Sequence, residues 1–412
     1  MRGRYISVVL GLMLFLGGCM EDGVNQARKN FQPTGEFLIR NIQIRENGDI
    51  ACVGSNRAGD TTKVYLYDQN LNLKNILIPS ANRDLKGYLH IQSLKNNDWL
   101  VVGSDARAED QVVAYRTNPD FNILHRQALT GKNFDTSWYA MFVYEVQELD
   151  NGDLMVVHDD FRVRSGFKVS RLGPDLSVRY QANPWFQYEK SNTASLFISS
   201  PKVMELSDGR FAGCFMREEI VWVQPNVSYE EAYTIQFGIM DAQGEPLLET
   251  QWLYKASHAQ IVSISETENS FVIGTIYNDE HLLHYHEVDK VTGKLMQTVQ
   301  LDNHFRNNRW VFPRYLNHFG YGEANRLPQK LSAHGGHFLY TPDAERVQYV
   351  QVQQGLKLTP TFTLFLPPVE EVGTMRQVFT NRETMLVGVS YQYNGLWYFN
   401  LQEVDFNGEI VP

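Results

Sequence analysis

Cysteine is scarce in this sequence, with 3 residues in 412. So few cysteines exclude a fold built on a disulfide framework. Beyond the N-terminal region, Cys52 and Cys214 each lie inside an apolar run, IACVG and FAGCFM. They could form one disulfide, but the apolar runs favour separate burial as two small apolar side chains.

The chain also lacks an excess of basic residues, and its formal net charge is -10. Neutralising phosphates requires a basic surface, so we expect no nucleic-acid partner. Proline is sparse, with 15 residues, while aromatic residues make up 12% of the chain. This composition is typical of a well-packed domain rather than a disordered stalk.

Familiar catalytic motifs are missing as well. We find no nucleophile elbow, phosphate-binding loop, zinc-protease helix or dinucleotide fingerprint. His284 and His286 share one face of an expected strand, but without a third ligand they predict strand histidines rather than a metal site. The acids Asp159 and Asp160 similarly favour a solvated loop over calcium. The sequence therefore predicts no cofactor and no metal, and it weighs against an enzyme without excluding one.

Long hydrophobic runs are absent except at the N-terminus. There, Arg2 and Arg4 precede an apolar stretch, 5–16, that is too short to span a bilayer comfortably. It is followed by Leu16-Gly17-Gly18-Cys19, which resembles the lipobox of bacterial lipoproteins. An ordinary signal peptide with a chance cysteine is the alternative. The resemblance implies a signal peptide at 1–18, acylation of Cys19 (palmitate or similar chains) and a flexible tether at 19–34.

The resemblance also implies a location. A lipid on Cys19 would anchor the chain to a membrane of the cell envelope. Lipoprotein sorting depends on an Asp after the lipidated cysteine, and Met20 occupies that position here. If the host has two membranes, we therefore expect the outer rather than the inner membrane.

After the tether, one pattern recurs along the whole chain: a short Asn/Gly/Asp turn, an apolar strand, a polar loop, a second strand and a second turn. The first turns fall near positions 48, 97, 152, 208, 269, 335 and 382, which are 47 to 66 residues apart. Asn-Gly between alternating apolar runs is a strong hairpin signal. Two hairpins give each unit four strands.

Repeated four-stranded units predict an all-β fold, a single β-propeller of seven four-stranded blades at 35–412. A row of independent β-sandwiches is the alternative, although it would not share one repeating turn pattern. The units resemble the degenerate repeats of exported bacterial lipoprotein propellers, a likeness that concerns the fold and implies no activity. We expect the N-terminal strand around 37–39 to complete the last blade, because closure removes an open sheet edge.

The long insertions all fall in the connections opposite the short turns, so one face of the ring is a candidate binding face. Segment 303–330 combines arginines with aromatic residues, which suits carboxylates, glycans or a protein partner. It could instead fold into a small core of its own. The candidate ligand-binding residues on this face are Trp138, Trp185, Tyr188, Arg217, Arg309, Trp310, Arg314 and Tyr315.

Two functions compete. The first is a cell-envelope lipoprotein whose propeller is a non-catalytic binding or scaffold module for a glycan or protein partner. The second is a propeller enzyme acting on glycans, a hydrolase or lyase, with carboxylates such as Asp159 and Asp160 and arginines such as Arg162 near the ring axis. Facing carboxylates about 5–10 Å apart would favour the enzyme.

Overall fold

The computed structural model describes the chain from Gln32 to Val411, with gaps. The parts outside the description are 1–31, 34–36, 57–60, 81–84, 106–110, 131–142, 161–165, 183–193, 225–227, 255–258, 278–282, 301–335, 341–345, 354–356, 366–370, 381–383, 408, 410 and 412. Every regular element in the described part is a β-strand, and no helix there is long and apolar enough to cross a membrane.

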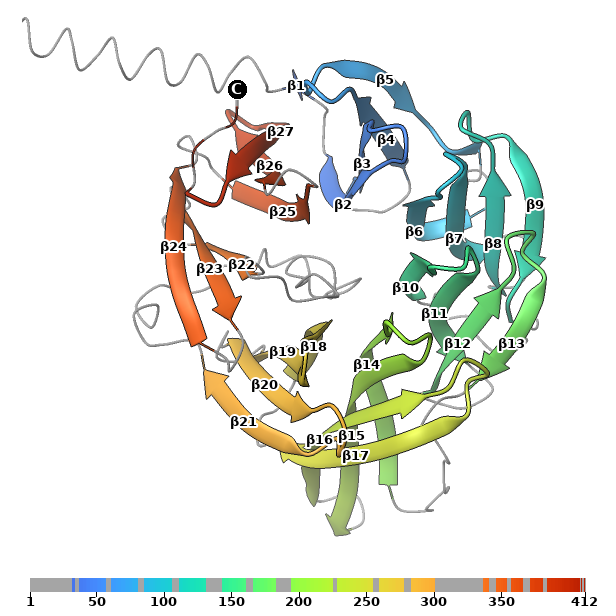
Figure 1. The fold of residues 1–412 in the computed structure, drawn as a ribbon, viewed down its shortest axis with the longest axis vertical. Helices are drawn as coiled ribbons and strands as arrows, with labels where there is room; N and C mark the ends of the chain where they lie inside the picture. The colour runs from blue at the N-terminus through green and yellow to red at the C-terminus, as the bar shows by residue number, and fades with distance from the viewer. Residues whose placement is uncertain are drawn as a thin grey trace, which may run out of the picture.

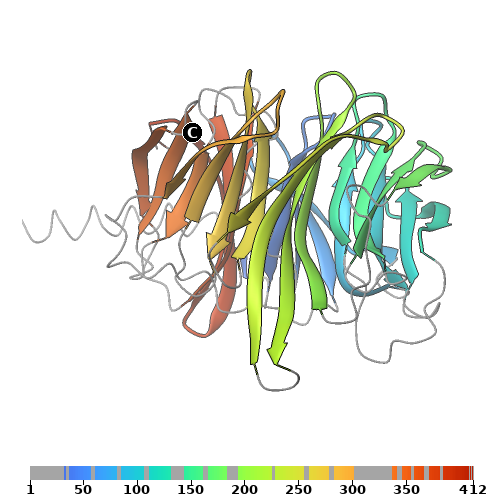
Figure 2. The same ribbon diagram turned by 90° about the horizontal axis from the view of Figure 1, so that it is seen from below.

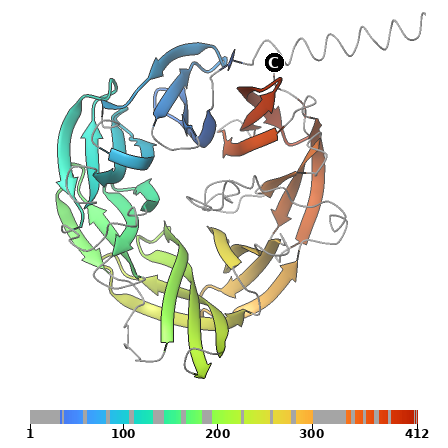
Figure 3. The ribbon, with the colours of Figure 1, turned by 180° about the vertical axis from the view of Figure 1, so that it is seen from behind.

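The strands form seven antiparallel sheets arranged around one axis (Figure 1). The same closed ring is seen from behind in Figure 3. The first four sheets contain β2 (Leu38–Ile44), β3 (Ile50–Ser55), β4 (Thr62–Tyr67) and β5 (Leu73–Leu77); β6 (Leu85–Ser93), β7 (Trp99–Asp105), β8 (Gln111–Thr117) and β9 (Ile123–Ala128); β10 (Val143–Glu148), β11 (Leu154–Asp160), β12 (Gly166–Leu172) and β13 (Val178–Ala182); and β14 (Ala194–Glu205), β15 (Phe211–Gln224), β16 (Ser228–Met240) and β17 (Pro246–Tyr254).

The remaining sheets complete the circle, and the propeller predicted from the sequence is confirmed. They contain β18 (Ala259–Glu266), β19 (Ser270–Tyr277), β20 (Leu283–Asp289) and β21 (Leu295–Gln300); β22 (Gly336–Tyr340), β23 (Arg346–Gln353) and β24 (Lys357–Phe365); and β25 (Glu371–Phe379), β26 (Thr384–Tyr393), β27 (Leu396–Asp405) and β1 (Gln32–Pro33). Six sheets have four strands, and the sixth along the chain has three within the described residues.

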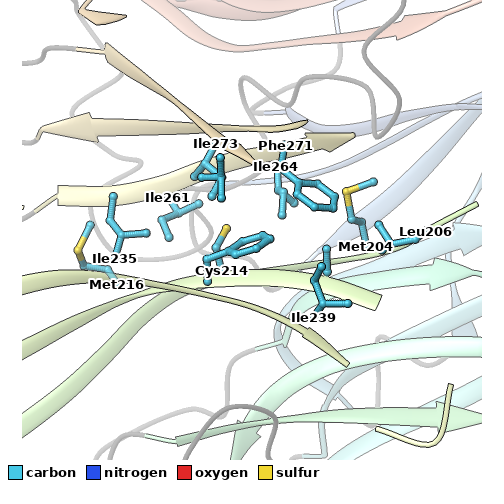
Figure 4. Close-up of a cluster of buried hydrophobic side chains, with 13 residues drawn as sticks. Met204, Leu206, Cys214, Met216, Ile235, Ile239, Ile261, Ile264, Phe271 and Ile273 are labelled. Carbon is cyan, nitrogen blue, oxygen red and sulfur yellow. The ribbon is translucent and has the colours of Figure 1, made fainter. Parts of the chain in front are cut away.

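The hydrophobic core lies between neighbouring sheets rather than at the axis. One cluster joins the fourth sheet to the fifth through Cys214, Phe237, Ile261 and Phe271 among others, drawn in Figure 4. Similar clusters join the first sheet to the second, the second to the third and the third to the fourth. Both faces of each inner strand are therefore buried, as in β3, where every residue is buried.

Ring closure uses the N-terminus, but not the segment expected from the sequence. The segment 37–39 belongs to the innermost strand of the first sheet, so the prediction that it completes the last blade was wrong. The closing strand is β1, whose Gln32 pairs with Phe399 of β27. It lies within 19–34, which was expected to be tether. Phe37 packs instead against Phe399 at the junction of the first and seventh sheets, with ring centroids 5.4 Å apart.

The outermost strand of the seventh sheet is shared by both ends of the chain. Past β27, the Asp405 backbone N–H donates to the Glu409 carbonyl, and the Val411 N–H donates to the Glu403 carbonyl at 2.9 Å. The C-terminal residues thus pair with the end of β27, and β1 pairs with its earlier residues Phe399 and Tyr398. Two short segments together occupy the position that β5 or β9 fills in other sheets.

The free cysteines follow the expectation of separate burial. Cys52 lies in the core between the first and seventh sheets, and Cys214 lies between the fourth and fifth. Burial raises the pKa of both thiols well above the ordinary value. Neither is therefore a reactive thiolate near neutral pH.

Candidate functional site

The two faces of the ring are built differently. In an antiparallel four-stranded sheet, the turns between the first and second strands and between the third and fourth lie at the same end. All such turns in the described part are short. On this face, Asn47, Asn96 and Asn151 each accept a backbone N–H two residues ahead through the side-chain oxygen, at 3.0 to 3.1 Å. These caps hold the tight turns in place.

The short-turn face is also cross-linked from sheet to sheet. Lys95 of the second sheet donates its backbone N–H to the Glu148 carboxylate of the third at 2.7 Å. Asp150 of the third sheet in turn donates its backbone N–H to Glu205 of the fourth at 3.0 Å. The polar groups of these turns thus already have partners within the protein, which suits a structural face.

Ion pairs reinforce this face. Asp153, at the end of the turn between β10 and β11, pairs with Arg171 at 2.7 Å, and both side chains are largely buried. The same arginine donates to the Ala242 carbonyl in the neighbouring fourth sheet at 3.1 Å. Asp98 and Arg116 repeat this pair in the second sheet at 2.9 Å, and Arg116 donates to the Pro174 carbonyl of the third.

The opposite face carries a projection of the fourth sheet. Strands β15 and β16 contain 14 and 13 residues, whereas their counterparts β11 and β12 in the third sheet contain 7 each. Figure 2 shows this hairpin extending beyond the ring on one side. The sequence pattern of this unit would place its polar loop between the apolar strand and the next strand, at 217–231. The strands instead continue through most of this segment, to Gln224 and again from Ser228.

Arg217 is the candidate ligand-binding residue that the structure places. It follows the buried run Phe211–Met216 of β15 and is half-buried, opposite Ile198 of β14 and Thr234 of β16. It therefore lies where the fourth sheet leaves the packed ring. The other candidates fall outside the described residues: Trp138, Trp185, Tyr188, Arg309, Trp310, Arg314, Tyr315, and the lipid attachment site Cys19.

The acids considered for catalysis lie on a strand. Asp159 and Asp160 end β11, opposite Phe167 and Gly166 of β12, rather than opening a loop. Arg162 lies outside the described residues.

The structure places His284 and His286 on β20, two residues apart. His286 is buried, and its Nε2 and Nδ1 lie 3.0 and 2.9 Å from the hydroxyls of Thr275 and Thr298. Both ring nitrogens are thus engaged by hydroxyls. Burial, and then the neighbouring His284, lower the pKa of His286 to about 3. Among the described residues, no group of three His, Cys, Asp or Glu could hold a metal ion.

A feature that sequence reasoning missed lies on the innermost strands, which surround the axis in Figure 1. The strands β2, β6, β10, β14, β18 and β25 each contain a register shift, a β-bulge or related irregularity. Bulges redirect side chains and often lie beside functional sites. On each of these strands, one polar residue lies directly after the register shift or close to it. These polar residues occupy equivalent register positions in their respective sheets. These residues form what we call the polar collar: Asn41, His90, Glu145, Lys202, Ser263 and Arg376.

The collar contains opposite charges on adjacent strands. Glu145 and Lys202 are only 6% and 4% exposed. The Val203 backbone N–H donates to the Glu145 carboxylate at 3.4 Å. After burial, which has the largest effect, Lys202 lowers and Glu145 raises the pKa of Cys214, so both charges lie close to this thiol. Asn41 and His90 are half-buried.

A sequence signal for the collar existed but was weak. Each of these residues lies a few positions before a short turn, in a strand that mixes apolar residues with other polar ones. Their equivalence emerges only from the register of the strands.

Comparison with known proteins supports the fold and reaches no family. No protein-family model matches the chain, and no curated protein matches it. A polysaccharide lyase, a PL25 ulvan lyase bound to -[GlcA(1-4)Rha3S]-, superposes with a TM-score of 0.56 at 9% identity, covering 92% of this chain and 97% of the lyase. A second PL25 ulvan lyase structure gives a TM-score of 0.57 at 8% identity, covering 91% of this chain and 96% of the lyase.

Two further structures match with lower TM-scores. The Dos1 propeller matches with a TM-score of 0.44 at 8% identity, covering 93% of this chain and 86% of Dos1. A GH93 α-L-arabinofuranosidase of Fusarium graminearum matches at 0.46 with 11% identity, covering 80% and 93%. At these identities the likeness concerns the fold, which hosts both enzymes and binding proteins.

Proposed function

We propose that this protein is a cell-envelope lipoprotein whose propeller binds a glycan on the face opposite the short turns. The observation that carries the proposal is the asymmetry of the ring. One face uses its polar groups in caps, ion pairs and bonds between sheets. The other carries the projecting hairpin of the fourth sheet.

A glycan suits the chemistry of this face. Arginines and aromatic rings are concentrated in its connections, above all in 303–330. Aromatic rings cover the apolar faces of sugars, and guanidinium groups donate paired hydrogen bonds to oxygen acceptors. The fold likeness to a lyase bound to a glycan supports the same choice.

The test is a glycan array probed with the purified protein, followed by calorimetry on the best ligand. Trp310→Ala and Arg314→Ala should weaken binding at least about tenfold, since a good anchor contributes about 2 kcal/mol or more. Their melting temperatures should stay close to that of the wild type. If Trp310→Ala instead unfolds the protein while ligand binding persists in the folded fraction, segment 303–330 is a small core.

A matched control lies on the other face. Asp208→Ala removes an exposed ion pair with Arg210 in a short turn. It should leave affinity unchanged and alter stability by less than about 1 kcal/mol. Binding of a protein from envelope extracts, with no glycan bound on the array, would favour a protein partner over a glycan.

A glycan-cleaving enzyme is the second candidate, favoured by the fold likeness to the ulvan lyase. A hydrolase would release new reducing ends from a bound polysaccharide. A lyase would release an unsaturated product that absorbs in the ultraviolet. Substituting Asp159→Asn and Asp160→Asn together should abolish the activity and spare binding. If the polysaccharide remains intact after prolonged incubation, that result would contradict the enzyme and leave glycan binding as the proposed function.

The membrane anchor is part of the proposal. Cys19→Ser should move the protein out of the membrane fraction or leave an uncleaved precursor, because a lipid on Cys19 would be the attachment to the bilayer. Labelled fatty acid should enter the wild type and not the variant. If the wild type and the variant fractionate in the same way and no labelled fatty acid enters the wild type, the proposed lipid anchor is contradicted. In a host with two membranes, density-gradient separation should place the wild type in the outer membrane.

A further inference from the structure

We infer that Met296 is a site of reversible oxidation, at which a peroxide converts the thioether to a sulfoxide while the protein stays folded. The inference goes beyond the proposed function and depends on neither the glycan nor the lipid anchor. It rests on the exposure of this methionine and on the irregular strand that presents it.

Exposure distinguishes Met296 from the other methionines whose side chains are described. Met296 is 58% exposed, whereas the five others are at most 1% exposed. These buried residues are Met155, Met204, Met216, Met240 and Met385. A peroxide in solution therefore reaches Met296 in the folded protein, and it reaches the buried sulfurs only after the surrounding core has opened.

The backbone of β21 explains this exposure. In this strand Leu295 pairs with Val288 and Gln297 pairs with Glu287, so Met296 is an additional residue with no residue opposite it in β20. An additional residue of this kind leaves the ladder and bends the strand. Because β21 is the outermost strand of the fifth sheet, no further strand covers Met296 in the described part of the chain.

The same irregularity recurs near the start of the outermost strand in each of the first five sheets, and the additional residue is exposed in every case. The residues equivalent to Met296 are Lys74, Leu124, Arg179 and Leu247. Exposure at this position is thus a property of the repeated sheet rather than of one side chain. Of these five residues, only the methionine is readily oxidised by a peroxide.

Met296 lies in an apolar part of the outer rim. Its chain neighbours Leu295 and Val291 are 38% and 85% exposed. The turn that precedes β21 lies against the fourth sheet, because a Cβ added at Gly293 would be 2.9 Å from the side chain of Leu248. Oxidation of Met296 therefore places a polar group among exposed apolar side chains on a well-supported strand.

The reaction is the transfer of an oxygen atom. A lone pair of the thioether sulfur attacks one oxygen of the peroxide, the O–O bond breaks and an S–O bond forms. The transferred oxygen gives its proton to the leaving oxygen, which departs as water or an alcohol. Sulfur is oxidised by two electrons and the peroxide is reduced by two. The sulfoxide is polar and chiral, and methionine sulfoxide reductases return it to the thioether.

The position of Met296 outside the core determines the effect on stability. A sulfoxide on a buried methionine places a polar group among apolar side chains and disrupts their packing. Met240, for example, belongs to the cluster that joins the third and fourth sheets through Phe211 and Phe215. At Met296 the sulfoxide oxygen is hydrated, so the folded state should keep its stability.

The test treats the full-length protein, purified in detergent, with hydrogen peroxide and follows each methionine by mass spectrometry of its peptides. We expect the sulfoxide to form at Met296 at least about tenfold faster than at each of the five buried methionines, because a buried sulfur reacts only from opened states. The melting temperature should stay unchanged while Met296 is oxidised. Treatment with the two reductases, one for each sulfoxide epimer, should restore the thioether.

Met296→Leu should abolish the fast reaction, and Met240→Leu, the same change at a buried site, should leave it intact. Equal rates at Met296 and at the buried methionines of the wild type would overturn the inference, whether or not either variant folds. A fall in melting temperature that follows oxidation of Met296, and that Met296→Leu prevents, would also overturn it, because this side chain would then support the fold. Neither outcome bears on glycan binding or on the anchor.

Discussion

Three turns place a bulky residue in a left-handed backbone conformation. Leu71, Phe121 and Leu176 have φ values of 61°, 62° and 64°, where glycine is the usual choice. Each lies at the equivalent point of the turn between the third and fourth strands. Glycines occupy this place in the fourth and fifth sheets, as Gly244 and Gly293. The side chain must therefore offset the backbone strain.

At Phe121 the packing of the ring offsets the backbone strain, and this balance predicts the effect of a substitution. Its ring is 1% exposed and stacks on Trp99 with centroids 5.0 Å apart. Phe121→Gly relieves about 1–2 kcal/mol of strain but removes packing worth about 3–5 kcal/mol. We expect a loss of about 2–3 kcal/mol in the free energy of unfolding, measured with urea. Asn394→Gly, at an exposed residue with φ of 50°, should change it little. A more stable Phe121→Gly would show that strain dominates.

The buried His286 predicts a dependence on pH. Its pKa is lowered to about 3 in the folded state, so between that value and about 6.5 the unfolded chain binds a proton that the folded protein excludes. Stability from this group is complete above about pH 6.5 and falls as the pH drops toward 3. His286→Gln should flatten the melting temperature between pH 7 and 4, while His125→Gln, at an exposed site on β9, should not. Identical slopes for all three proteins would contradict this account.

At the scale of the element, the turns and strands were predictable and the irregularities were not. Asn47-Gly48 and Asn151-Gly152 between apolar runs predict hairpins, because Gly48 and Gly152 adopt positive φ there. The strand irregularities and the closing strand depend on pairing between residues that are far apart in the sequence. The two residues of β1 carry no strand pattern, and the polar side chain at Glu145 reads locally as an edge or a loop. The candidate ligand-binding residues of the long connections had a chemical signal in arginine and aromatic content, but the sequence does not fix their geometry.

The innermost strands of the third and fourth sheets give a prediction about buried charge. Lys202→Met removes a cation that lies near the buried Glu145 carboxylate and should lower stability by about 3–5 kcal/mol. Adding Glu145→Gln should recover a substantial part of that loss, because the neutral amide has a smaller cost of burial. A double-mutant cycle from urea unfolding measures the coupling, expected to be about 1 kcal/mol or more. Strict additivity would mean that the two charges act independently.

At the scale of the whole molecule, stability depends on the seams between sheets. The first and seventh sheets are joined by Phe37, Ile39 and Ile42 on one side and by Leu386 and Phe399 on the other. The Ile39 backbone N–H also donates to the Ser390 hydroxyl at 3.0 Å. The closing strand β1 contributes just two paired residues. The apolar seam, rather than the closing strand, should therefore carry most of the closure energy.

Two truncations separate these contributions. A protein starting at 35 lacks β1 and should melt a few degrees lower, in one cooperative transition. A protein starting at 45 also lacks β2 and its buried side chains, and it should fail to fold as a ring. Calorimetry and far-ultraviolet circular dichroism measure both. If the first truncation alone abolished folding, the two-residue pairing would be the essential contact.

The shared outer strand of the seventh sheet makes the chain nearly cyclic. Val411 and Gln32 lie along one edge of β27, pairing near Glu403 and Phe399, four residues apart on that strand. A linker of a few residues could therefore join the natural ends, and new ends could be opened in any connection between sheets, such as the one between β5 and β6. In such a circular permutant the order of the sheets around the axis is unchanged. The position of the termini is thus a choice of where one continuous circle of sheets is cut.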